Sequence, residues 1–230
     1  MLKKINGRIV ISCAIWVIKN GRSWKEIPEG YGKFDTLRRR FSRWSKLDCF
    51  RSLFYYLAEK APKRSCAMID STTVKVHRTA ASMACDGKPR EIGRSVGGLT
   101  TKIHLIATLN KIPLDFSLTK GQVNDGLEGQ ELIARNTFRF KCPLADKAYD
   151  TNRIRCHLAE AGKEARIPPK SNRTDPAEYD KELYKKRSII ENMFGRLKDW
   201  RGIAMRYCRS AHMFDSFVCL ALISIFSDVR

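Results

Sequence analysis

The sequence predicts an α/β fold, a mixed sheet with helices on both faces, preceded by a small all-helical domain. Residues 1–62 show helical spacing of their apolar side chains. From Cys66 onward the period changes, and three β-rich segments precede helices that alternate with two further short strands. A hairpin followed by crossover helices gives a mixed sheet that helices cover on both faces. We therefore assign residues 1–62 to a helical domain and residues 66–230 to the α/β domain.

The helical domain contains an arginine-rich helix. Its first helix is expected at about residues 5–18, and a later one at about residues 36–46. In the later helix the apolar side chains form an inward stripe, while arginines project elsewhere: Arg38, Arg39, Arg40 and Arg43. Such a helix after a turn is typical of helix-turn-helix DNA-binding proteins. The alternative is a helical bundle with a solvated basic helix. Residues 61–64, "APKR", are the expected linker.

The order of elements in the α/β domain narrows the fold further. Strands are expected at residues 66–76, 100–109, 114–121, 142–149 and 163–169, and helices at residues 124–136, 150–162 and 184–200. This order is that of a ribonuclease H-like fold, in which the first and fourth strands are neighbours at the centre of the sheet. Residues 79–99 have no clear period and are expected to form a polar loop.

The charge balance indicates a polyanionic partner. The chain has 44 Lys+Arg against 24 Asp+Glu, a formal net charge of +20. Such an excess favours nucleic acid first and an anionic membrane second. The apolar run at residues 217–226 is too short to span a bilayer, and the run at residues 8–18 imitates a signal peptide but lacks a small-residue cleavage site. Both are expected to be buried helices. We therefore expect a nucleic-acid partner and no membrane.

The cysteines show no pattern of metal binding. None of the eight forms a C-x-x-C pair or lies at zinc-ligand spacing from a histidine. They fall mostly in apolar segments, so we expect reduced core thiols in a cytoplasmic protein.

Three acidic residues occur where secondary structure does not require them. Asp70 lies inside the first strand, Asp146 ends the apolar strand "PLAD", and Glu191 lies on the late helix. In a ribonuclease H-like sheet the two aspartates would meet on neighbouring strands, and the late helix could bring Glu191 beside them. Each acid also has a structural alternative. Asp70 could hydrogen-bond in a bulge, Asp146 could cap a turn, and Glu191 could pair only with Arg187.

Clustered carboxylates repel one another, so this cluster implies a cation. Oxygen ligands select Mg²⁺ or Mn²⁺. Two such ions activate the attacking oxygen and stabilise the leaving oxygen in phosphoryl transfer. We therefore expect Asp70, Asp146 and Glu191 to be both metal ligands and catalytic residues, with two ions bound.

The late helix carries a polar face. At about 100° per residue, Tyr184, Arg187, Glu191 and Lys198 lie on one side, and the apolar residues gather on another. One interpretation is an acidic ligand among cations that hold a polyanion. The other is a solvated face with an Arg187–Glu191 pair at i,i+4 spacing.

Other polar residues are weaker candidates. Lys102 and His104 share one face of the second strand and could approach DNA, although a solvated sheet face is favoured. Lys147 and Tyr149 follow Asp146 and could contact phosphate or base.

Asn124 or Asp125 is expected to cap the helix at residues 124–136, and Asp150 the helix at residues 150–162; helix caps are favoured over metal ligands for both aspartates.

Residues 66–225 resemble the DDE transposases of bacterial insertion sequences, of the insertion sequence five type. The last of the matching runs fits the family's Tyr-x2-Arg-x3-Glu-x6-Lys signature at Tyr184, Arg187, Glu191 and Lys198. The N-terminal helices also resemble the family's N-terminal region, although we expect the chain to be shortened at its N terminus. The matching runs are "MIDSTTVKVHR", "SVGGLTTKIHLIATLNKIPLDFSLTKGQVND", "LADKAYDTN" and "YKKRSIIENMFGRLKDWRGIAMRY".

The resemblance implies metal-dependent cleavage at the ends of an insertion sequence and strand transfer into target DNA. Asp70, Asp146 and Glu191 would be the catalytic triad holding two Mg²⁺, with Arg187 and Lys198 on phosphates and Tyr184 beside them. The partners would be double-stranded DNA, as terminal inverted repeats and target, and a second copy in a paired-end complex. A bacterial, nucleoid-associated location follows. The alternative is a truncated DNA-binding remnant that inhibits transposition without chemistry.

Overall fold

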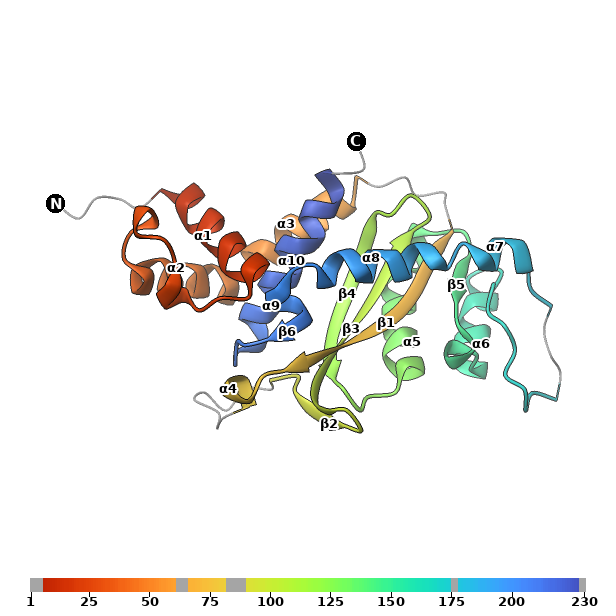
Figure 1. Cartoon of the computed structure of the whole chain (residues 1–230). Coiled ribbons are helices and arrows are strands. Elements are labelled where there is room, and N and C mark those ends of the chain that lie inside the picture. The colour runs from red at the N-terminus through yellow and green to blue at the C-terminus, as the bar shows by residue number, and fades with distance from the viewer. Residues whose placement is uncertain (1–5, 61–65, 82–89, 175–177, 228–230) are drawn as a thin grey trace.

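The computed structural model describes residues 6–60, 66–81, 90–174 and 178–227. Helices lie at one end of the molecule and the sheet lies at the other, with the C-terminal helices between them (Figure 1). The expected linker at residues 61–64 and part of the expected loop at 79–99 fall outside the described residues.

Three helices and two 3-10 turns form the N-terminal end. They are α1 (Gly7–Asn20), η1 (Trp24–Glu26), η2 (Glu29–Tyr31), α2 (Phe34–Lys46) and α3 (Cys49–Ala58). Helix α1 begins where the Asn6 side chain accepts a hydrogen bond from the Arg8 N–H. It ends at Gly21, whose φ of 63° is left-handed. A Cβ on Gly21 would also lie 2.9 Å from the Cβ of Arg201, so this turn requires glycine for two reasons.

The sheet has the predicted strand order. Strand β1 (Ala67–Val76) pairs antiparallel with β3 (Gly98–Thr108) and parallel with β5 (Pro143–Ala145), and β4 (Pro113–Lys120) pairs with the other side of β3. Short strands β2 (Gly93–Ser95) and β6 (Met205–Arg206) pair with β3 and β1. The expected strand at residues 163–169 is reduced to a single parallel bridge between Leu144 and Arg166.

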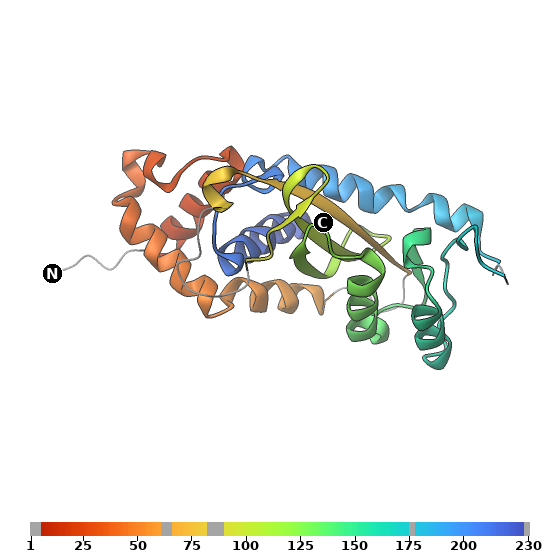
Figure 2. The same ribbon diagram turned by 90° about the horizontal axis from the view of Figure 1, so that it is seen from below.

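Helices cover both faces of the sheet, as predicted, and create two hydrophobic cores. Helices α5 (Asp125–Asn136) and α6 (Asn152–Glu160) pack on one face through residues such as Leu132 and Ile154. The other face is covered by α8 (Ser188–Lys198), α9 (Arg201–Ala204) and α10 (Ala211–Ser227) (Figures 1 and 2). Short elements complete the chain: α4 (Arg78–Ala81), η3 (Thr137–Arg139), η4 (Lys147–Tyr149) and α7 (Lys181–Lys185).

The N-terminal helices share the second of these cores. Phe41 of α2, Phe54 of α3 and Phe217 of α10 belong to one buried cluster, and the Phe41 and Phe217 rings stack at 5.1 Å. Phe54 also meets Phe116 of β4 at 5.5 Å. The uninterrupted packing explains why helices from both ends of the chain hold the helical end against the sheet. The division into domains at residues 62–66 remains a prediction.

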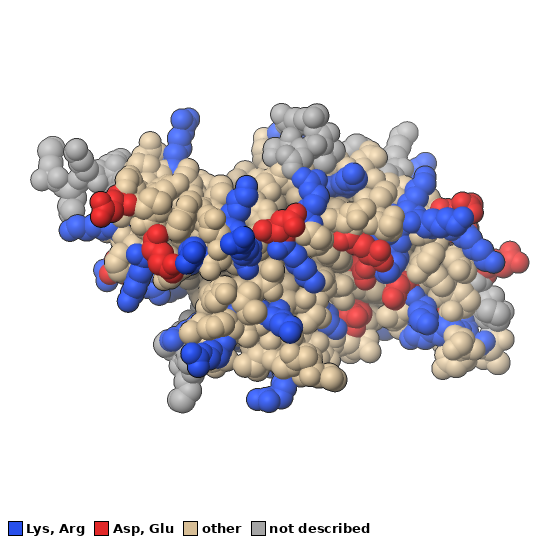
Figure 3. Space-filling model, in the orientation of Figure 1, with Lys and Arg blue, Asp and Glu red and all other residues tan. Residues whose placement is uncertain are grey.

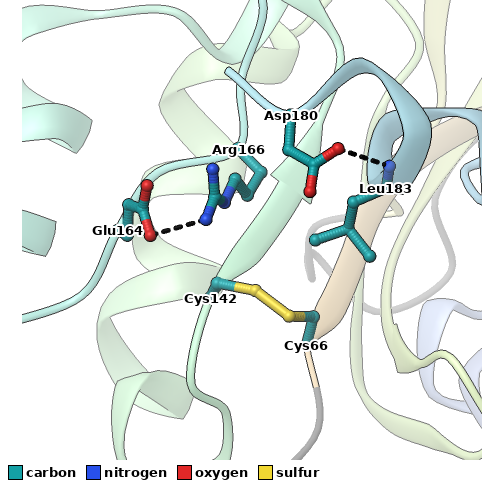
Figure 4. The surroundings of a disulfide bond; sticks show 6 residues. All are labelled: Cys66, Cys142, Glu164, Arg166, Asp180 and Leu183. Atoms are coloured by element: carbon teal, nitrogen blue, oxygen red, sulfur yellow. Dashed lines mark hydrogen bonds and ion pairs between the residues drawn. A yellow bond between two sulfur atoms is a disulfide. The ribbon is translucent and has the colours of Figure 1, made fainter. Parts of the chain in front are cut away.

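The prediction for the cysteines is wrong in part. Cys66 and Cys142 form a disulfide, with their Cα atoms 4.7 Å apart (Figure 4). They stand at the starts of β1 and β5, which run side by side in the same direction. Cys49 and Cys156 are exposed rather than in the core. Sequence spacing could not show that parallel pairing would bring Cys66 and Cys142 together.

The expected helix at residues 184–200 is divided into α7 and α8 by a turn at Lys186 and Arg187. Asp180 begins α7 by accepting a hydrogen bond from the Leu183 N–H at 2.9 Å (Figure 4). Within the described parts of the chain, no helix combines the length and apolar character needed to cross a bilayer.

Candidate active site

The candidate site lies at a gap in one edge of β1. Strand β5 pairs with β1 over residues 67–69, and β6 pairs with it at residues 75 and 76. Asp70 is the first residue after the β5 pairing, and Asp146 directly follows β5. Because Ile69 is in register with Ala145 on parallel strands, the two aspartates leave the ladder side by side. The structure thus brings together the two acids that are 76 positions apart.

Glu191 joins the aspartates through Arg187. The Arg187 guanidinium donates from Nη1 to Asp70 Oδ2 at 3.1 Å and from Nη2 to Glu191 Oε1 at 2.5 Å. The Asp70 side chain is 17% exposed, whereas that of Glu191 is 52% exposed. The i,i+4 pair that we gave as the alternative for Glu191 is therefore present, but it is part of a bridge that reaches the aspartate strand.

Repulsion and burial act on Asp70. Burial raises the pKa of its carboxyl, Arg187 and the Ser71 N–H oppose this, and Asp146 and Glu191 raise it further, to about 6. The Ser71 N–H donates to Asp70 Oδ1 at 2.9 Å. Burial is therefore the main cause of the raised pKa, and repulsion by the two neighbouring carboxyls adds to it.

Asp146 has a local structural role as well. Its Oδ1 accepts a hydrogen bond from the Ala148 N–H at 2.5 Å and begins the 3-10 turn η4. The predicted alternative, a turn cap, is thus also present. The hydrogen bond fixes the carboxyl at the end of β5.

The donor set fits a hard divalent cation. Asp70, Asp146 and Glu191 offer only oxygen atoms, which suit Mg²⁺ or Mn²⁺. The pKa of Asp70 is raised chiefly by burial, and Asp146 and Glu191 add to the rise. Among the described residues, no three acidic, histidine or cysteine side chains already stand at metal-ligand spacing. Arg187, between Asp70 and Glu191, is the cation that this arrangement contains.

The other residues of the late-helix face lie along the same edge. Tyr184 is half-buried beside Tyr179, with ring centroids 5.6 Å apart. Burial raises its pKa, Arg187 lowers it, and Asp146, Tyr179 and Asp70 raise it. Lys198 is seven positions beyond Glu191 on α8, which places it about 10 Å along the helix.

Lys147 is exposed directly after Asp146. On the face in Figure 3, acidic side chains gather over the middle of α8 and the strands below it, and Lys and Arg side chains flank them.

Helix α2 lies at the other end of the molecule from β5 and α7 (Figures 1 and 2). An open groove of about 370 Å³ runs along one side of α2 and is lined by Arg38, Arg39, Ser42, Arg43 and Lys46. Arg40 does not line it, because its guanidinium stacks on Trp44 at 5.3 Å. The structure therefore does not bring α2 to the acidic cluster.

The structure contradicts the solvated face expected for Lys102 and His104 and the contact with a base expected for Tyr149. Lys102 and His104 do not form a solvated face: α5 covers them, His104 is fully buried, and Lys102 Nζ donates to Asp125 Oδ1 at 2.8 Å. Tyr149 is 1% exposed and cannot present its side chain to a base. Which face of β3 is covered depends on where α5 docks, and local sequence does not show this.

The two aspartates expected to cap helices have other roles. Asn124 caps α5, and Thr151 caps α6. Asp150 is buried and accepts hydrogen bonds from Arg155 at 2.6 Å and Arg173 at 2.8 Å.

Most of the chain matches a known protein family. Residues 61–226 match the family described as Transposase DDE domain. This match covers most of the sequence, so the chain belongs to the DDE transposases.

The particular branch is given by a second match and by a curated relative. Residues 2–54 match the family described as Putative transposase of IS4/5 family. The chain is 32% identical over 124 residues to a putative transposase for insertion sequence element IS6501 of Brucella ovis, covering 54% of this chain and 95% of that protein. It is an insertion-sequence DDE transposase by family.

A second relative, the uncharacterized protein y4sN of Sinorhizobium fredii, is 31% identical over 78 residues, which are 34% of this chain and 62% of that protein. Solved structures are more distant. The catalytic domain of Mos1 mariner transposase is 10% identical with a TM-score of 0.31, covering 89% of this chain and 96% of that one. The Mos1 Strand Transfer Complex is 12% identical with a TM-score of 0.35, covering 100% and 79%. At these scores the likeness carries no argument about this chain.

Proposed function

We propose that this chain cleaves DNA at the ends of an insertion sequence and transfers the freed strand into target DNA. Asp70, Asp146 and Glu191 are the catalytic residues and hold two divalent ions, Mg²⁺ or Mn²⁺. The observation that carries this proposal is the meeting of Asp70 and Asp146 at the gap in β1, with Glu191 joined to them by Arg187.

In this proposal the acidic residues hold the divalent ions, and the basic residues bind and orient the DNA. When bound, the ions would supply an activated attacking oxygen and stabilise the leaving oxygen. The Ser71 and Ala148 N–H groups hold the two aspartates in fixed orientations. Arg187 turns from Asp70 toward a phosphate near the scissile bond, and Lys198 binds the DNA backbone farther along α8.

Two further contacts belong to this proposal. Lys147 is exposed beside Asp146 and binds a phosphate, and Tyr184 packs against the nucleotide next to it. We also propose that two copies hold the two element ends together, because transposition joins both ends to one target.

A cleavage assay tests the catalytic part. The substrate is a DNA fragment with the ends of the insertion sequence that encodes the chain, incubated with Mg²⁺. Asp70→Asn, Asp146→Asn and Glu191→Gln are each expected to abolish nicking and strand joining. Glu160→Gln, at an exposed position on α6, is the control and retains both. Cleavage retained in all three site variants eliminates the proposal.

The same variants distinguish the remnant alternative. A protein that binds element ends without chemistry inhibits transposition equally well with Asp70→Asn, and its wild type does not cut. The family match and the assembled carboxylates favour the enzyme.

We propose that the α2 groove binds the backbone of the element end. Its cations line one side of an exposed helix, with Arg38, Arg39 and Arg43 all outside the core. Replacing any one of them by Ala is expected to weaken binding and to reduce the slope of log K against log salt by about 0.9. Arg153→Ala, an exposed arginine on α6, leaves the slope unchanged. Equal slopes for all variants contradict a role for α2.

A further inference from the structure

Residues 168–173 leave the sheet beside Asp146, at the edge that carries the acidic cluster. Leu144 of β5 is bridged in parallel to Arg166, and the Arg166 N–H donates to the Pro143 carbonyl at 2.9 Å. Because the two chains run in the same direction, the residues after Arg166 leave the sheet at the same end as Asp146, which directly follows β5. The order across the sheet is β1, β5 and the chain at Arg166, so the 168–173 segment lies on the far side of Asp146 from β1.

The buried carboxylate of Asp150 fastens the 168–173 segment to the 3-10 turn η4. The Asp150 side chain is fully buried, and its Oδ2 accepts from the Lys170 N–H at 2.8 Å and from Arg173 Nε at 2.8 Å. The Asp150 N–H in turn donates to the Lys147 carbonyl at 3.1 Å, at the end of η4. The segment and the turn are therefore held together through one aspartate.

This arrangement brings Lys147 and Lys170 to the same aspartate, although they lie far apart in the sequence. Lys147 is exposed and Lys170 is half-buried. Within the described parts of the chain, neither lysine side chain forms an ion pair or a hydrogen bond, and the nearby Asp150 is already shared by Arg155 and Arg173. Two ammonium groups without acidic partners on one surface attract anions. A DNA backbone supplies such anions in a row, and lysine binds them as a point charge.

Cations thus lie on both sides of the acidic cluster. Arg187 contacts Asp70 from the α8 side. Lys147 directly follows Asp146, and the backbone of Lys170 lies beyond it, away from β1. In Figure 3, Lys and Arg side chains lie to the right of the acidic side chains below α8, over the β5 and α6 end of the molecule. A DNA strand that crosses the cluster therefore meets basic groups on either side of the carboxylates.

We propose that Lys170, together with Lys147, binds the phosphate backbone next to the scissile bond, and that Asp150 is the positioning residue that holds Lys170 there. Arg187 approaches the DNA from α8, whereas the two lysines approach it from beyond β5. The strand is thereby held on both sides of the bond to be cut. The inference rests on the proposed function, because the DNA must lie over the acidic cluster.

The test measures binding of the full chain to element-end DNA by fluorescence anisotropy at several salt concentrations. EDTA is present, so that neither metal nor cleavage is involved. Lys170→Ala removes one phosphate contact and is expected to reduce the slope of log K against log salt by about 0.9. Lys170→Arg keeps the charge and retains the wild-type slope. Lys141→Ala is the matched control, because Lys141 is exposed at the opposite end of β5, and it leaves the slope unchanged.

Hydroxyl-radical footprinting of the same complexes locates the contact on the DNA. The cleavage position is first mapped from the product that the wild type releases in Mg²⁺. Lys170→Ala is expected to lose backbone protection beside this position and to keep protection elsewhere. Unchanged protection beside the cleavage position contradicts the contact.

Asp150→Ala tests the positioning role. It releases the Lys170 N–H and is expected to lower the salt slope as far as Lys170→Ala does. Combining the two changes should have no further effect on the slope, because both remove the same contact. Partial unfolding does not reproduce this pattern, since it lowers the fraction of active protein and leaves the slope of the folded fraction unchanged. A double variant whose slope falls by the sum of the two losses contradicts the positioning role.

The outcomes separate this inference from the function on which it rests. A wild-type slope and footprint in Lys170→Ala overturn the inference and leave the proposed function intact, provided that the wild type nicks element ends in Mg²⁺ and Asp70→Asn does not. If the wild type neither binds nor cuts element-end DNA, both the inference and the proposed function are wrong.

Discussion

Replacing Arg187 by Gln removes the guanidinium that bridges Asp70 and Glu191. The Asp70 contact joins groups that are 20% and 17% exposed, so it behaves as a charge-assisted hydrogen bond of about 1.5–3 kcal/mol. The Glu191 carboxylate is 52% exposed, and that contact adds about 0–1 kcal/mol. The sum is about 2–4 kcal/mol in the metal-free protein. For a chain of this size each kcal/mol lowers the melting temperature by about 2–4 °C.

Metal should reverse most of this loss, because a divalent ion compensates the same carboxylates. The assay is thermal unfolding of wild type and Arg187→Gln, in EDTA and in saturating Mn²⁺. We expect a decrease of about 4–15 °C in EDTA and a much smaller one in Mn²⁺. Arg153→Gln, an exposed arginine on α6, is the control and changes neither. An equal decrease in both conditions, or none in EDTA, refutes the idea that guanidinium and metal compensate the same charges.

Three other predictions concern stability. Burial lowers the pKa of His104 to about 4. The unfolded state therefore binds the proton first as pH falls below 6.5, and wild type should lose about 3 kcal/mol relative to His104→Gln between pH 6.5 and 4. Urea denaturation of both proteins measures this difference, and a difference that is the same at pH 6.5 and pH 4 contradicts the prediction. Burial acts to raise the pKa of Asp150, but its arginine and backbone donors outweigh burial and lower it to about 2. The stability that Asp150→Asn loses, about 2–3 kcal/mol at pH 7, should therefore persist above pH 4 and fade toward pH 2; a pH-independent difference in urea midpoints argues against it. The disulfide closes a separation of 76 residues, so Cys66→Ser with Cys142→Ser should cost about 4 kcal/mol in oxidising buffer and nothing relative to wild type in dithiothreitol. A deficit that dithiothreitol does not remove indicates lost packing instead.

The acidic cluster could be predicted from the sequence because it depends on the order of the strands in the sheet. Asp70 and Asp146 sit at corresponding places on the first and fourth strands, and strand order alone makes these neighbours. Glu191 and Arg187 are four positions apart, and helical spacing keeps them together although a turn divides the expected helix just before α8. These features depend on order and period, which a single sequence contains.

The features that were missed depend on docking. Lys102 is covered because α5 packs on that face of β3. Asp125 pairs with Lys102 and does not cap the helix. Tyr149 was given a possible contact with phosphate or base because it follows a candidate ligand, yet its ring is buried against Gly129. The spacing of apolar residues along the sequence does not show which face of a helix packs against which strand.

The most direct test of the central claim is a crystal structure of the chain with Mn²⁺ and an element-end DNA, with manganese located by anomalous scattering. The account predicts anomalous peaks bound by the carboxylates of Asp70, Asp146 and Glu191, beside the scissile phosphate and with Arg187 turned away from Asp70. Manganese bound elsewhere, or DNA in place with these carboxylates apart and without metal, would contradict it.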